Sequence, residues 1–320
     1  MQALRVGLVG TGYWARVAHA RALGSTPGVE FSAVWGRNYV AAAALASGYG
    51  AAVHRDFDEF LSEVDAVAFS VPPDVQSGLA LRAARAGKHL LLEKPIAVTV
   101  AEADALVEAV EQAGVASAVF FTLLYEDDVR GWLAAVGSTG DWAGASGVWL
   151  GSALMADSPF HTPWRVAKGG LWDLGPHLVA LLWNVLGPVD AVTAAAGAGD
   201  VTHLVLHHRG GPDGGGPDGG GPDGGGPDRG GPDRGGRSSV VTVGMDVPEP
   251  AGFLELFLFG ASGRSTMPRE GNDPVVPLRT ALTELAANAW SGRLAHPCDV
   301  RFGRDVVHIL AQAAGQLLDV

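Results

Sequence analysis

Residues 5–15 of the chain read Arg5-Val-Gly-Leu-Val-Gly10-Thr-Gly12-Tyr-Trp-Ala15. An apolar run typical of a buried strand precedes the glycines, and a helical pattern follows them. In this G-x-G-x-x-A motif Gly10 permits a tight turn, Gly12 lets the backbone approach a pyrophosphate, and Ala15 allows close packing of helix on strand. We therefore predict a dinucleotide cradle at a helix N-terminus. Its expected contacts are Gly10, Thr11, Gly12, Tyr13, Trp14 and Ala15.

Short apolar runs alternate with alanine-rich helical patterns through the first 120 residues. The predicted strands are Arg5–Val9, Phe31–Trp35, Ala66–Val71, His89–Leu92 and Val115–Phe120. The predicted helices are Tyr13–Leu23, Tyr39–Ser47, Val75–Ala86 and Thr99–Ala113. Strands that alternate with helices imply βαβ crossovers. We expect an α/β fold, with residues 1–120 forming a Rossmann domain whose doubly wound parallel sheet has helices on both faces.

The pattern changes after residue 120, which marks a second domain over residues 121–320. Helical patterns occupy Asp127–Ala135, Pro176–Leu186 and Asp305–Leu318. Strand patterns occupy Ser146–Gly151, Val189–Ala195, Thr202–His207, Val240–Val247 and Gly252–Phe259. This order is typical of an α+β domain with an antiparallel sheet.

A repeat separates two of these strands. Residues 209–233 are five tandem copies of the unit Gly/Arg-Gly-Gly-Pro-Asp. Glycine and proline at this density oppose helix and sheet, and the unit offers little apolar surface to offset the entropy of ordering. We interpret residues 209–237 as a disordered loop that expands a hairpin, which costs little closure entropy.

Composition excludes several classes of protein. The chain has 320 residues, 48% of them hydrophobic, and a formal net charge of −12, which argues against nucleic acid as a partner. Its single cysteine, Cys298, excludes an intramolecular disulfide. We find no zinc-ligand spacing, no apolar run long enough to span a bilayer and no cleavable leader pattern. We expect a cytoplasmic protein without a metal site or membrane contact.

Cofactor choice depends on the end of the second predicted strand. NAD-binding domains place an acidic residue about 20 positions after the glycines, where it holds the ribose 2′-hydroxyl. Here the strand ends Trp35-Gly-Arg37-Asn38, and the next acid is Asp56. Arg37 favours NADP(H), because a guanidinium can clamp a 2′-phosphate. The alternative is an ordinary solvent-exposed arginine. Further expected cofactor contacts, at the ends of later strands, are Ser70, Pro72, Glu93, Lys94 and Pro95.

The second motif is Gly87-Lys-His-Leu-Leu-Leu-Glu93-Lys94-Pro95. A lysine at the carboxyl end of a parallel strand points into the crevice where open α/β sheets bind ligands. Lys94 would there orient a substrate hydroxyl. The alternative is a structural ion pair between Glu93 and Lys94.

The third motif is Gly169-Gly-Leu-Trp-Asp173-Leu-Gly175-Pro-His177. Asp173 and His177 are four residues apart, so the start of a helix places them on one face. A carboxylate near an imidazole raises its basicity and makes a general base. The alternative is that Asp173 caps the helix and His177 is a hydrogen-bonded core residue.

Together, and in this order, the three motifs resemble the Gfo/Idh/MocA family of oxidoreductases (glucose–fructose oxidoreductase, inositol dehydrogenase). The resemblance implies a Rossmann domain followed by a domain with a large open, mainly antiparallel sheet that commonly mediates oligomerisation. It also implies that Lys94, Asp173 and His177 form the catalytic set, and that the Lys94–Pro95 peptide is cis. We accordingly expect a homo-oligomer, a dimer or tetramer.

Known relatives mostly oxidise or reduce a secondary alcohol of a sugar, polyol or diol. Residues near the third motif that could contact such a substrate are His161, Trp164, Arg165, Lys168 and Trp172. The alternative for the two tryptophans is a packing role in the core. The chain departs from the family twice. It lacks an Asn-x-Arg-like segment at Phe120–Tyr125, and Gln76 stands where many relatives have histidine.

The sequence leaves three functions open. The first is an NADP(H)-dependent dehydrogenase or reductase in which His177 accepts the hydroxyl proton, Asp173 assists and Lys94 holds the oxygen. The second is a nicotinamide-dependent glycosidase or lyase that oxidises its substrate transiently. The third is a non-enzymatic dinucleotide sensor, which would not need this proton-transfer set.

Overall fold

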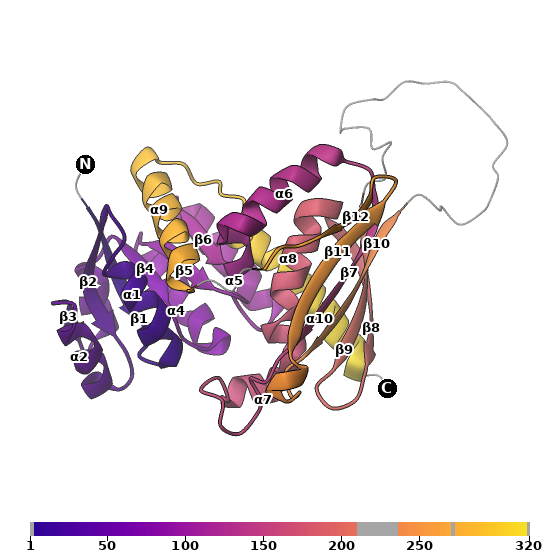
Figure 1. The fold of residues 1–320 in the computed structure, drawn as a ribbon. Helices are drawn as coiled ribbons and strands as arrows, with labels where there is room; N and C mark the ends of the chain where they lie inside the picture. Colours follow the sequence, from indigo (N-terminus) through magenta and orange to yellow (C-terminus); the bar gives the residue numbers. More distant parts are fainter. Residues whose placement is uncertain (1–2, 210–235, 270–272, 319–320) are drawn as a thin grey trace.

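The computed structural model describes residues 3–209, 236–269 and 273–318. Two six-stranded sheets lie in separate halves of the molecule (Figure 1). The predicted fold class is confirmed: a doubly wound parallel sheet forms from the N-terminal residues, and a second sheet, mainly antiparallel, forms from the later ones. Within the described residues, no helix is long and apolar enough to cross a membrane.

The first sheet has the strand order β3-β2-β1-β4-β5-β6, with all neighbours parallel. Its strands are β1 (Leu4–Val9), β2 (Val29–Trp35), β3 (Ala52–His54), β4 (Ala66–Phe69), β5 (His89–Glu93) and β6 (Ser117–Phe120). The order reverses between β1 and β4, and such a switch point opens a crevice at the carboxyl ends of the strands. Every residue of the central strand β4 is buried, as expected for a parallel strand covered by helices on both faces.

Helices connect these strands at nearly the predicted positions. They are η1 (Ala15–His19), α1 (Ala20–Leu23), α2 (Tyr39–Ser47), α3 (Phe57–Ser62), α4 (Pro73–Arg85) and α5 (Val100–Ala113). The helix after the glycine turn contains a π-helical turn, η1, which the sequence did not predict. The three-residue strand β3 and the short helix α3 were also missed, because elements of this length carry too few residues to show a period.

The second sheet has the order β12-β11-β7-β10-β9-β8, and only its β7–β10 pair is parallel. The strands are β7 (Trp142–Leu150), β8 (Val189–Ala196), β9 (Thr202–His208), β10 (Arg237–Gly244), β11 (Phe253–Gly260) and β12 (Gly263–Thr266). His208 and Arg237 are register partners, so the glycine–proline repeat joins two paired antiparallel strands. Our prediction of a disordered loop at residues 209–237 falls mostly on residues 210–235, which lie outside the described residues; its last residue was wrong, because Arg237 pairs with His208 as the first residue of β10.

Helices of the later residues cover one face of the second sheet and return to the first. They are η2 (Thr122–Tyr125), α6 (Asp127–Thr139), α7 (Pro163–Asp173), α8 (Gly175–Leu186), η3 (Glu249–Ala251), α9 (Val275–Ser291) and α10 (Val300–Leu318). α9 packs against α1, β5 and β6, whereas α10 contacts both β8 and α5. The chain after residue 275 therefore binds the two sheets together, and the boundary at residues 120–121 stays a prediction.

Candidate functional site

A cavity of about 690 Å³ lies where the carboxyl ends of the parallel strands face the second sheet. Its N-terminal wall consists of Gly12, Tyr13, Trp14, Ser70, Val71, Pro72, Pro73, Glu93 and Lys94. Its other wall includes Thr122, Glu126, Trp149, Phe160, Trp164, Arg165, Asp173, His177, Met245 and Arg269. The lining combines aromatic surface with a few converging charged groups, which is typical of a small-molecule site.

The glycine turn has the geometry that a dinucleotide cradle requires. Gly10 adopts a positive φ of 125°, and a Cβ at this position would collide with the carbonyl oxygen of Ser70. A Cβ built on Gly12 meets no atom within 4 Å, so the backbone there faces open space that a pyrophosphate can enter. Gly12 also borders the cavity, so a dinucleotide bound at the turn would extend into it.

Arg37 is exposed just beyond the end of β2 and does not line the cavity. Neighbouring Gly36 packs against Thr11, since a Cβ on Gly36 would lie 2.9 Å from the Thr11 Cγ2 atom. The glycine turn and the start of the Arg37 loop are thus in contact. The NADP(H) preference of Arg37 stays a prediction.

Gln76 and Glu93 hold the turn that presents Lys94. The buried Gln76 side chain donates through Nε2 to the Glu93 carbonyl oxygen at 2.7 Å and accepts from the Glu93 backbone N–H at 2.8 Å. The Glu93 carboxylate accepts from Trp14 Nε1 at 2.7 Å and contacts His19 Nε2 at 2.8 Å. The peptide between Lys94 and Pro95 is cis, as the resemblance implied. Gln76 therefore supports the turn at the position where relatives have histidine.

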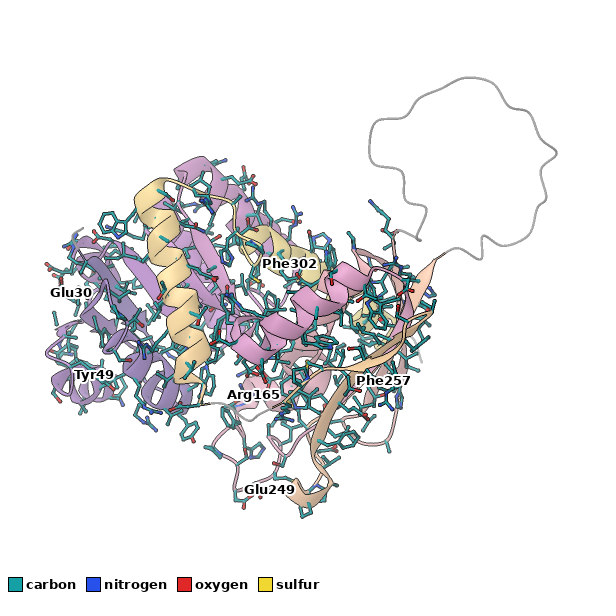
Figure 2. All side chains as sticks on the ribbon, turned by 45° about the horizontal axis from the view of Figure 1, so that its top comes forward. Glu30, Tyr49, Arg165, Glu249, Phe257 and Phe302 are labelled. Atoms are coloured by element: carbon teal, nitrogen blue, oxygen red, sulfur yellow. The ribbon has the colours of Figure 1, made fainter. Side chains whose placement is uncertain are left out.

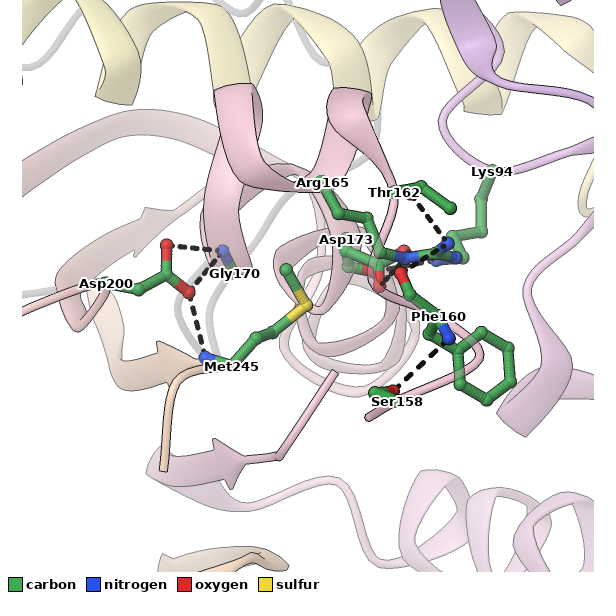
Figure 3. A network of polar contacts seen from close by, with 9 residues as sticks. All are labelled: Lys94, Ser158, Phe160, Thr162, Arg165, Gly170, Asp173, Asp200 and Met245. Carbon is green, nitrogen blue, oxygen red and sulfur yellow. Dashed lines mark hydrogen bonds and ion pairs between the residues drawn. The ribbon is translucent and has the colours of Figure 1, made fainter. Parts of the chain in front are cut away.

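Lys94 pairs with Asp173, across the junction between the two halves, rather than with Glu93. Its Nζ atom lies 2.6 Å from Asp173 Oδ1 and donates to the Asp173 carbonyl oxygen at 2.8 Å. Arg165 Nε donates to Asp173 Oδ2 at 2.8 Å (Figure 3). Figure 2 shows Arg165 at this junction. Burial alone would raise the pKa of Asp173, but Lys94 and Arg165 hold it well below its usual range.

His177 lines the cavity, and among the described residues its ring forms no hydrogen bond with Asp173. Burial lowers its pKa well below the ordinary value, Lys94 lowers it further, and the charge of Asp173 only partly opposes them. Its Nδ1 atom is buried without a hydrogen-bond partner among the described residues, and its ring lies 5.3 Å from that of Trp149. Asp173 thus raises the pKa of His177, as expected, but burial and Lys94 outweigh it and the net shift is downward. Asp173 ends α7 and faces Lys94, whereas His177 belongs to α8.

The predicted substrate residues divide between cavity and surroundings. Trp164 and Arg165 line the cavity, with the Arg165 guanidinium 4.7 Å from the Trp164 ring centre. Trp172 is buried, and the Lys168 ammonium lies 5.3 Å from its ring centre. His161 is exposed and borders no part of the cavity. The core alternative therefore fits Trp172.

Several lining residues carried no signal in the sequence. Phe160 packs against the glycine turn, with its ring 5.3 Å from Tyr13 and 6.0 Å from Trp14. Trp149 sits in β7 with no motif around it. Glu126 borders the cavity, and burial, aided by Asp128, raises its pKa to about 7. A helical or strand pattern identifies none of them, because each reaches the cavity through the packing of distant elements.

Comparison with known proteins gives a family match for the N-terminal part of the chain. Residues 4–121 match the model of an oxidoreductase family with an NAD-binding Rossmann fold, GFO_IDH_MocA. An uncharacterized oxidoreductase of Rhizobium meliloti is 30% identical over 185 residues, which cover 56% of this chain and 55% of that protein. The dTDP-3,4-didehydro-2,6-dideoxy-alpha-D-glucose 3-reductase of Streptomyces violaceoruber is 29% identical over 58% of this chain and 56% of its own length.

The alignments with these two relatives thus span little more than half the length of each. A solved structure extends the likeness of the fold to the whole chain. It is GenD2 from gentamicin A biosynthesis in complex with NAD, with a TM-score of 0.80 and 20% identity over 100% of this chain and 95% of GenD2.

Proposed function

We propose that this chain, whose residues 4–121 match the model of the Gfo/Idh/MocA oxidoreductase family, is an NADP(H)-dependent oxidoreductase. Its substrate is a secondary alcohol, or the matching ketone, of a sugar, polyol or small diol. The observation that carries this proposal is one cavity bordered by Gly12, Lys94 and His177. The named relative that reduces a dTDP-linked sugar supports a carbohydrate-like substrate.

The proposed chemistry depends on the Lys94 ammonium and the His177 imidazole, which both line the cavity. A dinucleotide held by its pyrophosphate at the glycine turn would supply the hydride acceptor or donor through its nicotinamide. In the oxidative direction His177 accepts the hydroxyl proton as the carbinol carbon gives up its hydride. Its depressed pKa keeps the imidazole neutral at neutral pH, which leaves a ring nitrogen without a proton, and the same shift makes it a weaker base than a free histidine. Lys94, fixed by Asp173, stabilises the negative charge that develops on the substrate oxygen.

The role of Asp173 in this proposal is to orient Lys94. Its carboxylate is 8% exposed and bonds two cations, so a substitution there leaves buried charge without a partner. Breaking a buried ion pair on one side costs about 3–5 kcal/mol. An Asp173 variant would therefore confound folding with catalysis, and His177 makes the cleaner test.

We expect His177→Ala to lose turnover by about 10²–10⁴-fold, the usual contribution of a general base, while the NADP(H)-induced rise in melting temperature persists. A panel of sugars, polyols and diols with both cofactors, followed by nicotinamide absorbance, provides the assay. His203→Ala is the control, since His203 is exposed on β9 away from the cavity. Full turnover in His177→Ala would remove the base role. Substrate conversion without net absorbance change would favour transient oxidation instead.

The preference for NADP(H) is tested at Arg37. Thermal shift should show greater stabilisation by NADP(H) than by NAD(H), and Arg37→Asp should reverse that order, because the carboxylate repels a 2′-phosphate and accepts from a 2′-hydroxyl. Arg85→Asp, a change at an exposed arginine near the end of α4, is the matched control for the change in net charge. Equal shifts with both cofactors would contradict the assignment.

We also propose that the protein is a homo-oligomer that associates through the second sheet. The helices α8 and α10 cover one face of this sheet. The other face exposes apolar side chains, with Val240, Phe253 and Phe259 each at least 45% exposed. Extended apolar surface of this kind is typical of an interface.

A further inference from the structure

The helix α7, which carries Asp173, is broken at Gly169. Within α7, Gly169 has φ 67° and ψ −171°, so the chain leaves the helix there and enters a new one at Gly170. Arg165 belongs to the segment before the break, and Asp173 to the segment after it. The direction of this second segment, which leads into α8 and His177, decides whether Lys94 meets the carboxylate.

A carboxylate from the second sheet holds the start of this segment. Both Asp200 oxygens accept from the Gly170 backbone N–H, at 3.1 and 2.9 Å, and Oδ2 also accepts from the Met245 N–H at 2.8 Å (Figure 3). Asp200 lies between β8 and β9, and Met245 follows β10. The Asp200 N–H in turn donates to Asp246 at 3.1 Å. One side chain thus joins the helix start to the ends of three strands.

The packing around the break leaves the helix start little freedom. A Cβ on Gly170 would lie 2.9 Å from the Gly244 Cα atom, so the helix begins directly against β10. A Cβ on Gly169 would overlap the Asp200 carboxylate. A negative group at a helix N-terminus satisfies an N–H that has no partner inside the helix and complements the helix dipole. Asp200 does not itself line the cavity.

We propose that Asp200 is a positioning residue, which fixes the helix start at Gly170 so that Asp173 meets Lys94 and His177 borders the cavity. This inference rests on the proposed function for its kinetic readout, and on the contact between Lys94 and Asp173 for a second readout that needs no turnover. Asp200 touches neither substrate nor cofactor, and acts through Gly170.

The kinetic test compares Asp200→Ala with Asp200→Asn at 25 °C, below their melting temperatures. We expect Asp200→Ala to lower kcat about 10–100-fold, because small misplacement of reacting groups costs this much. NADP(H) affinity should stay within about twofold. Asp200→Asn keeps one acceptor oxygen and should lie between wild type and Asp200→Ala. The control is Asp190→Ala, whose carboxylate pairs with Arg209 on the surface.

The labelling test uses the three lysines of the chain, Lys88, Lys94 and Lys168. Brief treatment with acetic anhydride followed by mass spectrometry gives the acylation rate of Lys94 relative to Lys88, whose Nζ donates to the Val64 carbonyl oxygen at 2.9 Å. We expect this ratio to rise severalfold in Asp200→Ala and less in Asp200→Asn. An unchanged ratio, or unchanged kcat with only a lower melting temperature, would overturn the positioning role. If the protein turns over no alcohol of the panel, the ratio of the Lys94 and Lys88 acylation rates alone tests the positioning role of Asp200.

Discussion

Glu126 carries a pH dependence that its position makes testable. Burial and Asp128 raise its pKa to about 7 in the folded protein, against the ordinary 4.5, while exposed Arg269 acts in the opposite direction. Between these values the folded state binds more protons than the unfolded one, so stability falls as pH rises from about 4.5 to 7 and levels off above. We predict that Glu126→Gln reduces this fall in melting temperature, and that Asp127→Asn, at the exposed neighbouring carboxylate, leaves it unchanged. An equal slope in Glu126→Gln would contradict the assignment.

At the scale of single residues, the sequence predicted which residues border the cavity better than it predicted which residues pair with each other. Lys94 and His177 were found because motifs fix their places, and both border the cavity. The partner of Asp173 was missed because Lys94 lies 79 residues away along the chain. Spacing within one helix indicates which side chains share a face of that helix. It does not indicate that Lys94, which follows β5 of the first sheet, will contact that face. Asp200 was missed for the same reason.

Two glycines of α10 provide a matched pair for testing how this helix docks. A Cβ on Gly303 would lie 2.8 Å from Ile96 Cγ2 and 3.0 Å from Val119 Cγ2, whereas one on Gly315 meets nothing within 4 Å. Replacing a helical glycine by alanine gains about 0.5–1 kcal/mol from propensity, and overpacking costs about 1–3 kcal/mol. We predict that Gly315→Ala raises and Gly303→Ala lowers the free energy of unfolding, measured by urea titration. Equal changes would mean that α10 docks loosely.

At the scale of elements, a helix or strand was predicted correctly where it is long enough to show a periodic pattern of apolar residues. The long parallel-sheet strands and the helices between them were predicted because each carries several turns or alternations. α7 escaped because Gly169 and Gly170 interrupt its pattern, and α9 escaped although its buried leucines, Leu278, Leu282 and Leu285, recur at helical spacing. The break in α7 lies between Arg165 and Asp173, so the helical pattern failed where the backbone is irregular.

At the scale of the whole molecule, the C-terminal helices decide how the two sheets are held. α9 packs on the first sheet and α10 packs between the two, so residues 275–318 complete the first domain. Lys94 and Asp173 meet across the same junction. The local sequence pattern does not indicate that the C-terminal helices pack back on the first sheet. A single domain boundary at residues 120–121 therefore describes the fold incompletely.

The outward face of the second sheet provides the last test, which concerns assembly. Val240 is 47% exposed on the central strand β10, and Val276 is 49% exposed on α9, far from that face. If two copies associate through the sheet, Val240→Lys buries an unpaired charge in the interface and should yield monomers, because an uncompensated buried charge costs several kcal/mol. Val276→Lys adds the same charge on the other side and should leave the assembly intact. Light scattering after gel filtration measures both masses. A wild-type monomer, or an unchanged Val240→Lys oligomer, would exclude this face as the interface.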